Sequence, residues 1–132
     1  MIKIKTKLGL STKKGIGLFA DENIPKGSVV GINTDNLSIV RYSEKDWENL
    51  KENLTEESFK HIKKYAYKNK DDGLYWLNLD NTRFINHSDD PNIATIGDND
   101  VAIKDIKIND EILIDYKTFY DPDYFEEIMM IQ

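Results

Sequence analysis

The stretch RFINHSDDPN at residues 83–92 is the most informative part of this chain. It places three polar side chains, Asn86-His87-Ser88, directly after the apolar pair Phe84-Ile85 and ends in an Asp-Pro turn signal. Asn, His and Ser carry polar groups that must find hydrogen-bond partners once they are buried. A compact chain that gathers all three at one point is therefore predicted to build a polar site there.

Two other segments add to this pattern. Near the start, Gly15-Ile16-Gly17 predicts a tight turn or a backbone that comes close to a ligand. It is not the dinucleotide-binding fingerprint, because the third glycine and the following helix of that motif are absent. Near the end, the polar pair Asp115-Tyr116 closes an apolar, strand-like run.

His87 and Ser88 invite two other interpretations. A serine hydrolase is disfavoured because adjacent side chains on an extended segment point in opposite directions, and the chain has no Gly-x-Ser-x-Gly elbow. A metal centre is disfavoured because the other histidine, His61, falls on a predicted surface helix without a matching ligand spacing. A buried polar network that only holds two segments together remains an open alternative.

In this order, the three motifs resemble the signatures of the SET-domain protein-lysine N-methyltransferases. The resemblance runs from about Lys13 to Tyr116 and is weakest between residues 35 and 78. It implies an α+β, mainly β, fold: the SET (β-clip-like) arrangement of small curled sheets with a helical insert and a C-terminal pseudoknot. Because the chain has no cysteine, it is most similar to minimal stand-alone bacterial or viral members that lack a cysteine-rich post-SET segment.

The resemblance also assigns roles to residues of this chain. It implies S-adenosyl-L-methionine as the cofactor, no metal, and Tyr116 as the catalytic residue, acting by positioning rather than as a strong base. The cofactor-binding residues that it implies are Gly15, Ile16, Gly17, Arg83, Asn86, His87, Tyr116 and Phe119. The residues implied for the substrate channel are Tyr65, Tyr75, Ile114 and Tyr120.

Two of these positions carry further expectations. In place of the missing cysteine-rich cover, we expect aromatic residues that follow Tyr116, with Phe119 and Tyr120 as the preferred lid. Two positions before the catalytic tyrosine, the family often has Phe or Tyr, and this chain has Ile114. A smaller side chain that forms no hydrogen bond would leave room for di- or trimethylation.

Composition limits the partners. The net charge of −6 argues against nucleic-acid binding and favours a basic, lysine-containing protein substrate, although acidity alone also keeps a protein in solution. No apolar run approaches membrane-spanning length, and the absence of cysteines suits a reducing compartment. We therefore expect a cytoplasmic protein of bacterial or viral type that does not bind membranes. A homodimer that completes the site is a further expectation, by analogy with minimal relatives.

At 132 residues the chain predicts one SET domain over residues 1–132. We divide it into an N-terminal β part (1–34), a variable helical insert (35–78), a C-terminal β part with the pseudoknot (79–116) and an aromatic tail (117–132). Within the insert, Ser43 and Thr55 are placed to cap two helices. Strands are expected at 17–20, 28–32, 74–79, 93–96, 101–104 and 111–116, with a turn at 97–100.

An internal repeat links the two β parts. The residues Ala20, Ile24, Gly27 and Val30 have the same spacing as Ala102, Ile106, Asn109 and Ile112. Gly and Asn are the residues that most readily adopt the left-handed backbone conformation, so both units are predicted to turn at the same point. The repeat therefore favours a pseudo-symmetric β scaffold on either side of the helical insert.

The function predicted from the sequence is S-adenosylmethionine-dependent methyl transfer to the side-chain amine of a protein lysine. Two alternatives remain: a non-catalytic SET-fold module that binds a peptide or nucleoside, and a structural protein whose polar cluster is only a staple.

Overall fold

The computed structural model describes residues 1–130. Its helices are α1 (Glu44–Asn53), α2 (Glu56–Tyr65) and α3 (Pro122–Met130), and 3₁₀ turns span Asn81–Phe84 and Tyr116–Thr118. Its strands are β1 (Thr6–Leu10), β2 (Ile16–Ala20), β3 (Val29–Ile32), β4 (Ile39–Tyr42), β5 (Tyr67–Lys68), β6 (Tyr75–Asn78), β7 (Asn86–His87), β8 (Ile93–Ile96), β9 (Asn99–Ala102) and β10 (Leu113–Ile114).

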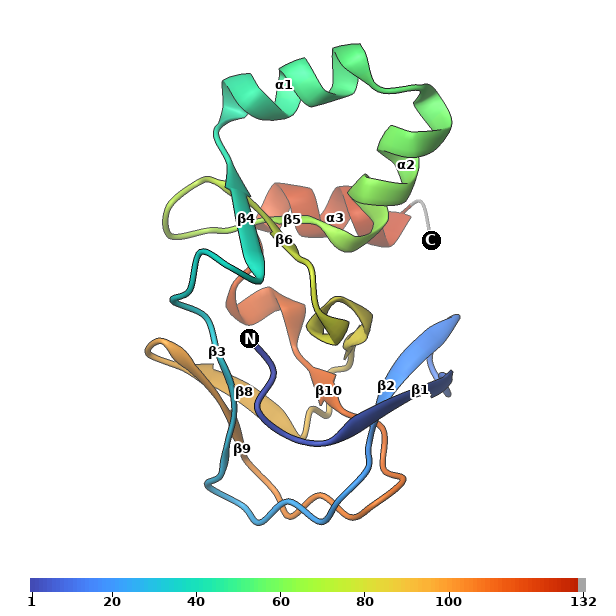
Figure 1. Ribbon diagram of the computed structural model, residues 1–132, viewed down its shortest axis with the longest axis vertical. Coiled ribbons are helices and arrows are strands. Elements are labelled where there is room, and N and C mark those ends of the chain that lie inside the picture. The colour runs from blue at the N-terminus through green and yellow to red at the C-terminus, as the bar shows by residue number, and fades with distance from the viewer. Residues whose placement is uncertain (131–132) are drawn as a thin grey trace.

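These strands form several small sheets instead of one large one. Sheets β3-β9-β8 and β4-β6-β5 are three-stranded, and β1-β2 and β7-β10 are pairs. Figure 1 shows the insert and α3 in one half of the molecule and the β1-β2 and β3-β9-β8 sheets in the other, with β10 between these two sheets. No helix within residues 1–130 is long and apolar enough to cross a membrane.

The repeat noticed in the sequence is a real structural pair. Ile24 and Ile106 face each other across an antiparallel bridge and exchange two backbone hydrogen bonds of 2.7 and 2.8 Å. Gly27 N–H donates to the carbonyl of Ala102, and Asn109 N–H donates to the carbonyl of Ala20. The predicted turning points both have positive φ, 90° at Gly27 and 76° at Asn109. The turns at equivalent points are confirmed, and the structure adds that the two units pair reciprocally with each other.

The segment 109–116 lies between two parts of the chain that precede it. On one side, Ile112 N–H donates to the carbonyl of Leu18 in β2. On the other side, β10 pairs in parallel with β7, and Ser88 N–H donates to the carbonyl of Ile114. Ile112 is fully buried as a result, in a core that also contains Leu18, Val30, Ile93 and Ile106. This insertion is the pseudoknot expected from the family resemblance.

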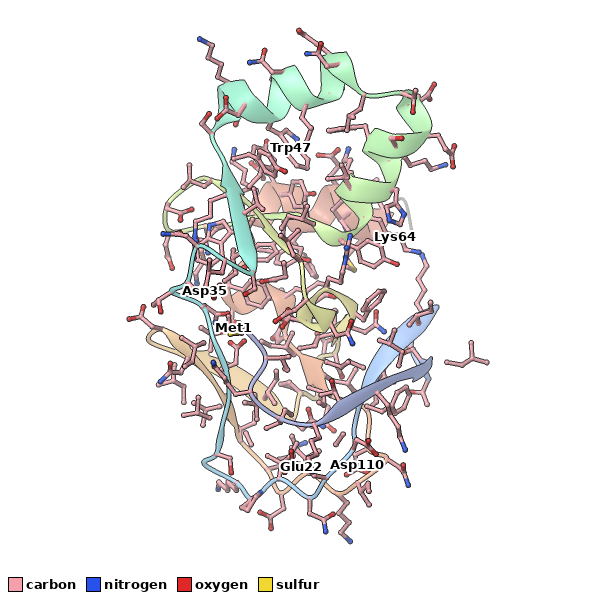
Figure 2. All side chains as sticks on the ribbon, in the orientation of Figure 1. Met1, Glu22, Asp35, Trp47, Lys64 and Asp110 are labelled. Carbon is pink, nitrogen blue, oxygen red and sulfur yellow. The ribbon has the colours of Figure 1, made fainter. Side chains whose placement is uncertain are left out.

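The insert has its own aromatic core. The caps are as predicted, since the Ser43 and Thr55 side chains accept hydrogen bonds from the backbone N–H groups of Asp46 and Ser58. Trp47 of α1 stacks on Tyr75 of β6 with ring centroids 4.4 Å apart, and its indole contacts Phe59 of α2 edge-on at 5.1 Å. In Figure 2, Trp47 projects from α1 toward β4 and β6, so the helices cover this sheet.

Some boundaries differ from those expected. β9 begins at Asn99, because the β8-β9 turn needs only Gly97 and Asp98, and the positive φ of Gly97 (62°) makes so tight a turn possible. The last strand is shorter than 111–116, because Asp115 already caps the 3₁₀ turn that begins at Tyr116. The expected tail contains helix α3, and its last residues, 131 and 132, lie outside the described residues.

Because Trp47 joins both insert helices to β6, replacing it with alanine should destabilise the protein strongly. We expect Trp47→Ala to lower the free energy of unfolding by about 3–5 kcal/mol, the usual range for a buried tryptophan. Urea denaturation followed by circular dichroism measures this loss. Glu48→Ala, at the exposed neighbouring position, is the matched control and should change the stability by less than about 0.5 kcal/mol. Equal stability of the two variants would contradict the role given to Trp47.

Candidate active site

A polar junction connects the three sequence motifs. The side-chain amide of Asn86 in β7 donates to the carbonyl of Ile16 at 3.1 Å and to Glu111 Oε2 at 3.3 Å. Glu111 in turn accepts from Ser11 Oγ at 2.6 Å and from the backbone N–H of Thr12 at 3.1 Å. The Gly-Ile-Gly segment, the Asn-His-Ser segment and the strand leading to Asp115-Tyr116 therefore meet at one point.

The local structure explains why both positions of the first motif are glycine. Gly15 has a φ of 59°, a backbone conformation that residues with a side chain rarely adopt. Gly17 has no such strain, but a Cβ there would lie 2.5 Å from Glu111 Oε2 and 3.1 Å from Ser11 Cβ. The first glycine therefore allows the turn, and the second allows the backbone to approach the Glu111 carboxylate.

The junction controls the ionisation of Glu111. Burial alone would raise the pKa of this carboxyl group, but hydrogen bonds from Ser11, Asn86 and Thr12 together hold the pKa below its ordinary value. A carboxylate that accepts several hydrogen bonds is stabilised in its charged form. Glu111 is therefore an anion that ties together segments distant in the sequence.

Glu111→Gln should reveal this charge through the pH dependence of stability. A carboxyl group with a depressed folded-state pKa stabilises the protein above its unfolded pKa and loses this contribution as the pH falls through the folded value. We expect the variant to be less stable than the wild type at pH 7 and the gap to close as the pH falls below 4.5, the ordinary value of the group. Urea denaturation across pH 3 to 7 measures the gap, and a gap independent of pH would contradict the argument.

His87 positions the backbone of Tyr116. Its Nδ1 accepts a hydrogen bond from Tyr116 N–H at 3.0 Å, so the ring proton of the neutral imidazole is on Nε2, which faces Asp89 Oδ1 at 3.3 Å. Lys117 holds the same Asp89 oxygen at 3.0 Å. Asp115 completes a group with ligand atoms within 4.8 Å of one another, but Asp89 is already held by His87 Nε2 and by Lys117. We interpret the group as a polar network in which the Asp89–Lys117 ion pair fixes the orientation of the imidazole.

The phenol of Tyr116 is part of an aromatic stack. Its ring lies parallel to Tyr120 with centroids 4.5 Å apart, and Tyr120 stacks on Tyr67 at 5.0 Å. The Tyr116 hydroxyl donates to the carbonyl of Ile85, the residue before Asn86. Burial raises the pKa of all three phenols, and the charge of Asp100 raises that of Tyr67 further. These tyrosines are therefore neutral at physiological pH.

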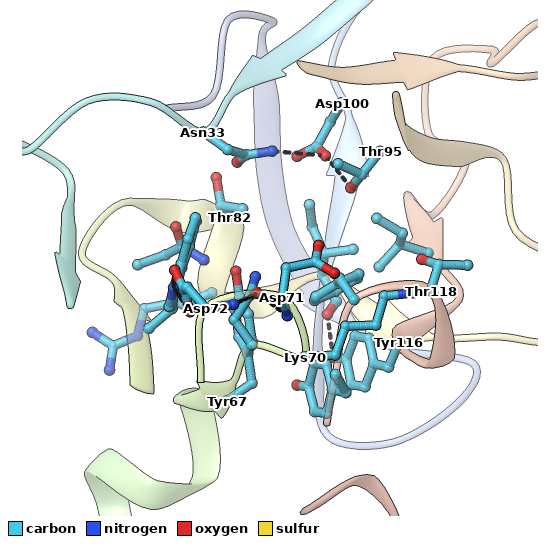
Figure 3. Close-up of a pocket in the computed structure, with 18 of the residues that line it drawn as sticks. Asn33, Tyr67, Lys70, Asp71, Asp72, Thr82, Thr95, Asp100, Tyr116 and Thr118 are labelled. Carbon is cyan, nitrogen blue, oxygen red and sulfur yellow. Dashed lines mark hydrogen bonds between the residues drawn. The ribbon is translucent and has the colours of Figure 1, made fainter. Parts of the chain in front are cut away.

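A pocket of about 500 Å³ opens beside this stack. Figure 3 shows Tyr67 and Tyr116 on one side of it and Asn33, Thr95 and Asp100 on another. Its lining residues come from both halves of the molecule and include Tyr65, Tyr67, Asn78, Arg83, Asp100 and Tyr116. The pocket therefore lies at the boundary between the insert and the β core.

The predicted site residues fall into two groups in the structure, one at the polar junction and one around the pocket, and a single predicted residue belongs to neither. The polar junction and its network hold Gly15, Ile16, Gly17, Asn86 and His87. The pocket is lined by Tyr65, Arg83, Ile114, Tyr116, Phe119 and Tyr120. Tyr75 lies elsewhere, stacked on Trp47, because alternate residues of β6 face opposite sides and its neighbour Trp76 faces the pocket.

Other pocket residues were not singled out from the sequence. Asn78, Thr95 and Asp100 bring polar side chains to the wall, and Asn78 and Asp100 are more than nine-tenths buried. Asp100 was assigned to a turn, where an aspartate is unremarkable. The signal that could have found it is its place in an alternating pattern, Asp100 and Ala102 both being buried residues of one strand.

Comparison with known proteins identifies the fold. A SET-domain family model matches residues 15–117. A candidate histone methyltransferase of Plasmodium falciparum is 27% identical over 87% of this chain and 95% of its own, with a TM-score of 0.57. A SET-domain histone lysine methyltransferase of Neurospora is 22% identical over 87% of this chain and 53% of its own, with a TM-score of 0.57. Apo ctPRC2 with mutations in Ezh2 matches at 22% identity over 94% of this chain and 16% of its own, with a TM-score of 0.64.

No curated protein matches the chain. The two structures at 22% identity support the fold alone. The family model, in contrast, spans most of the sequence, including all three motifs. The chain therefore belongs to the SET-domain family, and the α+β, mainly β, fold predicted from the sequence is confirmed.

Proposed function

We propose that this protein transfers a methyl group from S-adenosyl-L-methionine to the side-chain amine of a protein lysine. The observation that carries the proposal is that Tyr116 contacts two parts of the site at once. Its backbone N–H is bound to His87 in the motif region, and its phenol lines the aromatic pocket. One residue thus links the segment proposed to hold the methyl donor to the pocket proposed to hold the amine.

The residues present suit the cofactor. Arg83 lies over the Tyr65 ring with its guanidinium carbon 4.6 Å from the centroid, and its Nε is buried without a hydrogen-bond partner in the described structure. A buried donor without a partner is costly, and a bound acceptor such as a carboxylate would satisfy it. We assign Arg83 and the backbone at Gly15 to Gly17, with Asn86 and His87, to cofactor binding.

When bound, the cofactor supplies a methyl group on a sulfonium, which an amine displaces in line. The chain must therefore deliver a neutral, aligned amine and exclude water. Stacked aromatic walls made by Tyr67, Tyr116 and Tyr120 would desolvate an ammonium group and lower its pKa, which favours the neutral form. The phenols themselves are neutral, so this wall adds no anion of its own beside the amine.

Tyr116 is proposed to act by position. It remains protonated because burial raises its pKa, and its proton is donated to the Ile85 carbonyl. The lone pairs of its oxygen are therefore available to orient a ligand, whereas the phenolate needed for a strong base is disfavoured. Ile114 on the same pocket wall adds no hydrogen-bonding group, which supports the proposal that more than one methyl group can be added.

A protein substrate is supported by the relatives, since the Plasmodium structure is described as a histone methyltransferase candidate and is 27% identical to this chain. Purified core histones are therefore a reasonable first probe for methyl transfer.

Cofactor binding is the first test. We expect isothermal titration calorimetry to give saturable binding of S-adenosylmethionine and its demethylated product to the wild type, and no measurable binding to Asn86→Ala. The Asn86 amide fixes the Ile16 carbonyl and so shapes the backbone assigned to the cofactor. Circular dichroism must show that the variant is folded, and Asn49→Ala, on exposed α1, is the matched control. A folded wild type that binds neither ligand would refute the proposal.

Tyr116→Phe separates catalysis from cofactor binding. Loss of the hydroxyl leaves the ring stack but removes the oxygen that orients the reacting groups. We expect methyl transfer to core histones to fall by about a hundredfold, with cofactor affinity changed less than threefold. Transfer of tritium from labelled cofactor measures the rate. If the variant and the wild type transfer methyl groups at the same rate, Tyr116 has no role in the reaction.

A further inference from the structure

The two ring nitrogens of His87 have different partners. Nδ1 accepts from the backbone N–H of Tyr116 at 3.0 Å, and Nε2 faces Asp89 Oδ1 at 3.3 Å. Only a ring nitrogen without a proton can accept a hydrogen bond, so the contact to Tyr116 exists in the neutral imidazole alone. The proposed methyl transfer uses this contact to hold Tyr116, but it gives no role to a change in the charge of the ring.

A protonated His87 has acceptors already close to both nitrogens. Asp115 Oδ1 lies 3.7 Å from Nδ1, so a movement of less than 1 Å, roughly, would bring it within hydrogen-bond distance of an Nδ1–H group. Asp89 Oδ1 already faces the other nitrogen. On protonation, the ring therefore exchanges the backbone of Tyr116 for the carboxylate of the residue before it.

The surroundings of this ring contain charges of both signs. The carboxylates of Asp89 and Asp115 favour the protonated ring, and the ammonium group of Lys117, 3.0 Å from Asp89 Oδ1, opposes it. The aromatic rings of Tyr116 and of Phe125 in α3 also pack against it, each with its centroid 5.3 Å away. The side chain is 18% exposed, so protons from the solvent reach it. Imidazole groups typically change charge between pH 5 and 8, so both states are accessible.

Loss of the contact would affect the whole turn that carries the phenol. Asp115 caps the 3₁₀ turn Tyr116–Thr118 by accepting from the backbone N–H of Lys117 at 3.0 Å. A carboxylate drawn toward Nδ1 weakens this cap, and the N–H of Tyr116 loses its acceptor at the same time. The hydroxyl of Tyr116 donates to the Ile85 carbonyl from the same turn. Protonation of one ring therefore loosens the residue that is proposed to align the reacting groups.

We propose that His87 is a proton switch that positions Tyr116. The neutral imidazole holds the backbone of Tyr116 in the arrangement that binds the cofactor, and the imidazolium releases it. The effect on methyl transfer rests on the proposed function, whereas the switch itself is a property of the ligand-free chain. Cofactor binding is then favoured at neutral and alkaline pH and is lost as the pH falls through the titration of His87.

A purely structural role is the competing explanation, in which His87 holds the turn in one charge state at every pH. His87→Asn distinguishes the two, because the amide oxygen of asparagine is as many bonds from Cβ as Nδ1 is. This oxygen can accept from the N–H of Tyr116, but it does not gain a proton between pH 5 and 8. His61→Asn, on the exposed side of α2, is the matched control, since it removes the other of the two histidines.

Nuclear magnetic resonance of the ligand-free protein from pH 5 to 8 measures the switch directly. A scalar coupling between the amide nitrogen of Tyr116 and Nδ1 of His87 reports their hydrogen bond. We expect this coupling at pH 8 and its loss at pH 5, with the Tyr116 amide and the His87 imidazole sharing one midpoint. His61→Asn should behave like the wild type, and the Tyr116 amide of His87→Asn should keep its shift across the range.

Three results would overturn the switch: no coupling at pH 8, a coupling that persists at pH 5, or a Tyr116 amide that still titrates in His87→Asn. If His87→Asn does not fold, the couplings in the wild type and in His61→Asn decide.

Calorimetric titration with S-adenosylhomocysteine at pH 7.5 and 5.5 measures the consequence for the site. An imidazole with the ordinary pKa of about 6.5 is neutral in about a tenth of the molecules at pH 5.5, and the apparent affinity falls in the same proportion. We expect the dissociation constant to rise about tenfold in the wild type and in His61→Asn, and by less than about twofold in His87→Asn. An equal rise in all three proteins, as titration of the ligand itself would produce, would refute the effect on binding.

The outcome can be separated from that of the proposed function. The resonance measurements need neither cofactor nor substrate. A coupling lost with the titration of His87, in a protein that binds no cofactor at any pH, would keep the switch and refute the methyl transfer. Cofactor binding and methyl transfer in a protein whose Tyr116 amide ignores the charge of His87 would do the opposite.

Discussion

The insertion of residues 109–116 between β2 and the segment 86–92 is the constraint on which the rest of the structure depends. Ile112 and Ile114 fill the β core from this position, with backbone hydrogen bonds on both sides. The same insertion brings Glu111 to Asn86 and to the Gly17 backbone. Core packing and assembly of the site therefore occur together. Along this short segment, side chains that fill the core alternate with side chains that form the junction.

The site also depends on having two hydrophobic cores instead of one. The aliphatic core of the β parts and the aromatic core of the insert have different compositions, and Tyr116 and Phe119 pack against both. A pocket at such a boundary can have a polar wall from one side and an aromatic wall from the other. This arrangement lets a single small domain offer hydrogen-bonding groups and a desolvating surface to the same ligand.

Much of the fold could be predicted because local rules decided it. Ser43 and Thr55 cap their helices. The repeat turns at Gly27 and Asn109, where the positive φ favours glycine and asparagine over other residues. The site residues that could be predicted were those in short contiguous motifs, such as Asn86. Tyr75 and Trp76 could not be told apart, because both are aromatic and only the packing of α1 on β6 decides which one faces the pocket. Asp100 was missed because it was assigned to a turn, and its hydrogen bond from Asn33, which is distant in the sequence, has no local signal.

The position of β10 in the chain order has a consequence for biosynthesis. Its partners lie near residues 18 and 86, so the pairings that close the core have large sequence separations. Such contacts form slowly, because the entropy of closing long loops is lost before the contacts compensate for it. Once residue 102 has been synthesised, every strand except β10 is complete, and β10 is the strand that joins β2 to the segment 86–92. The nascent chain therefore exposes the apolar surfaces around Leu18 and Ile93 until β10 emerges, and such exposed surfaces promote aggregation during that interval.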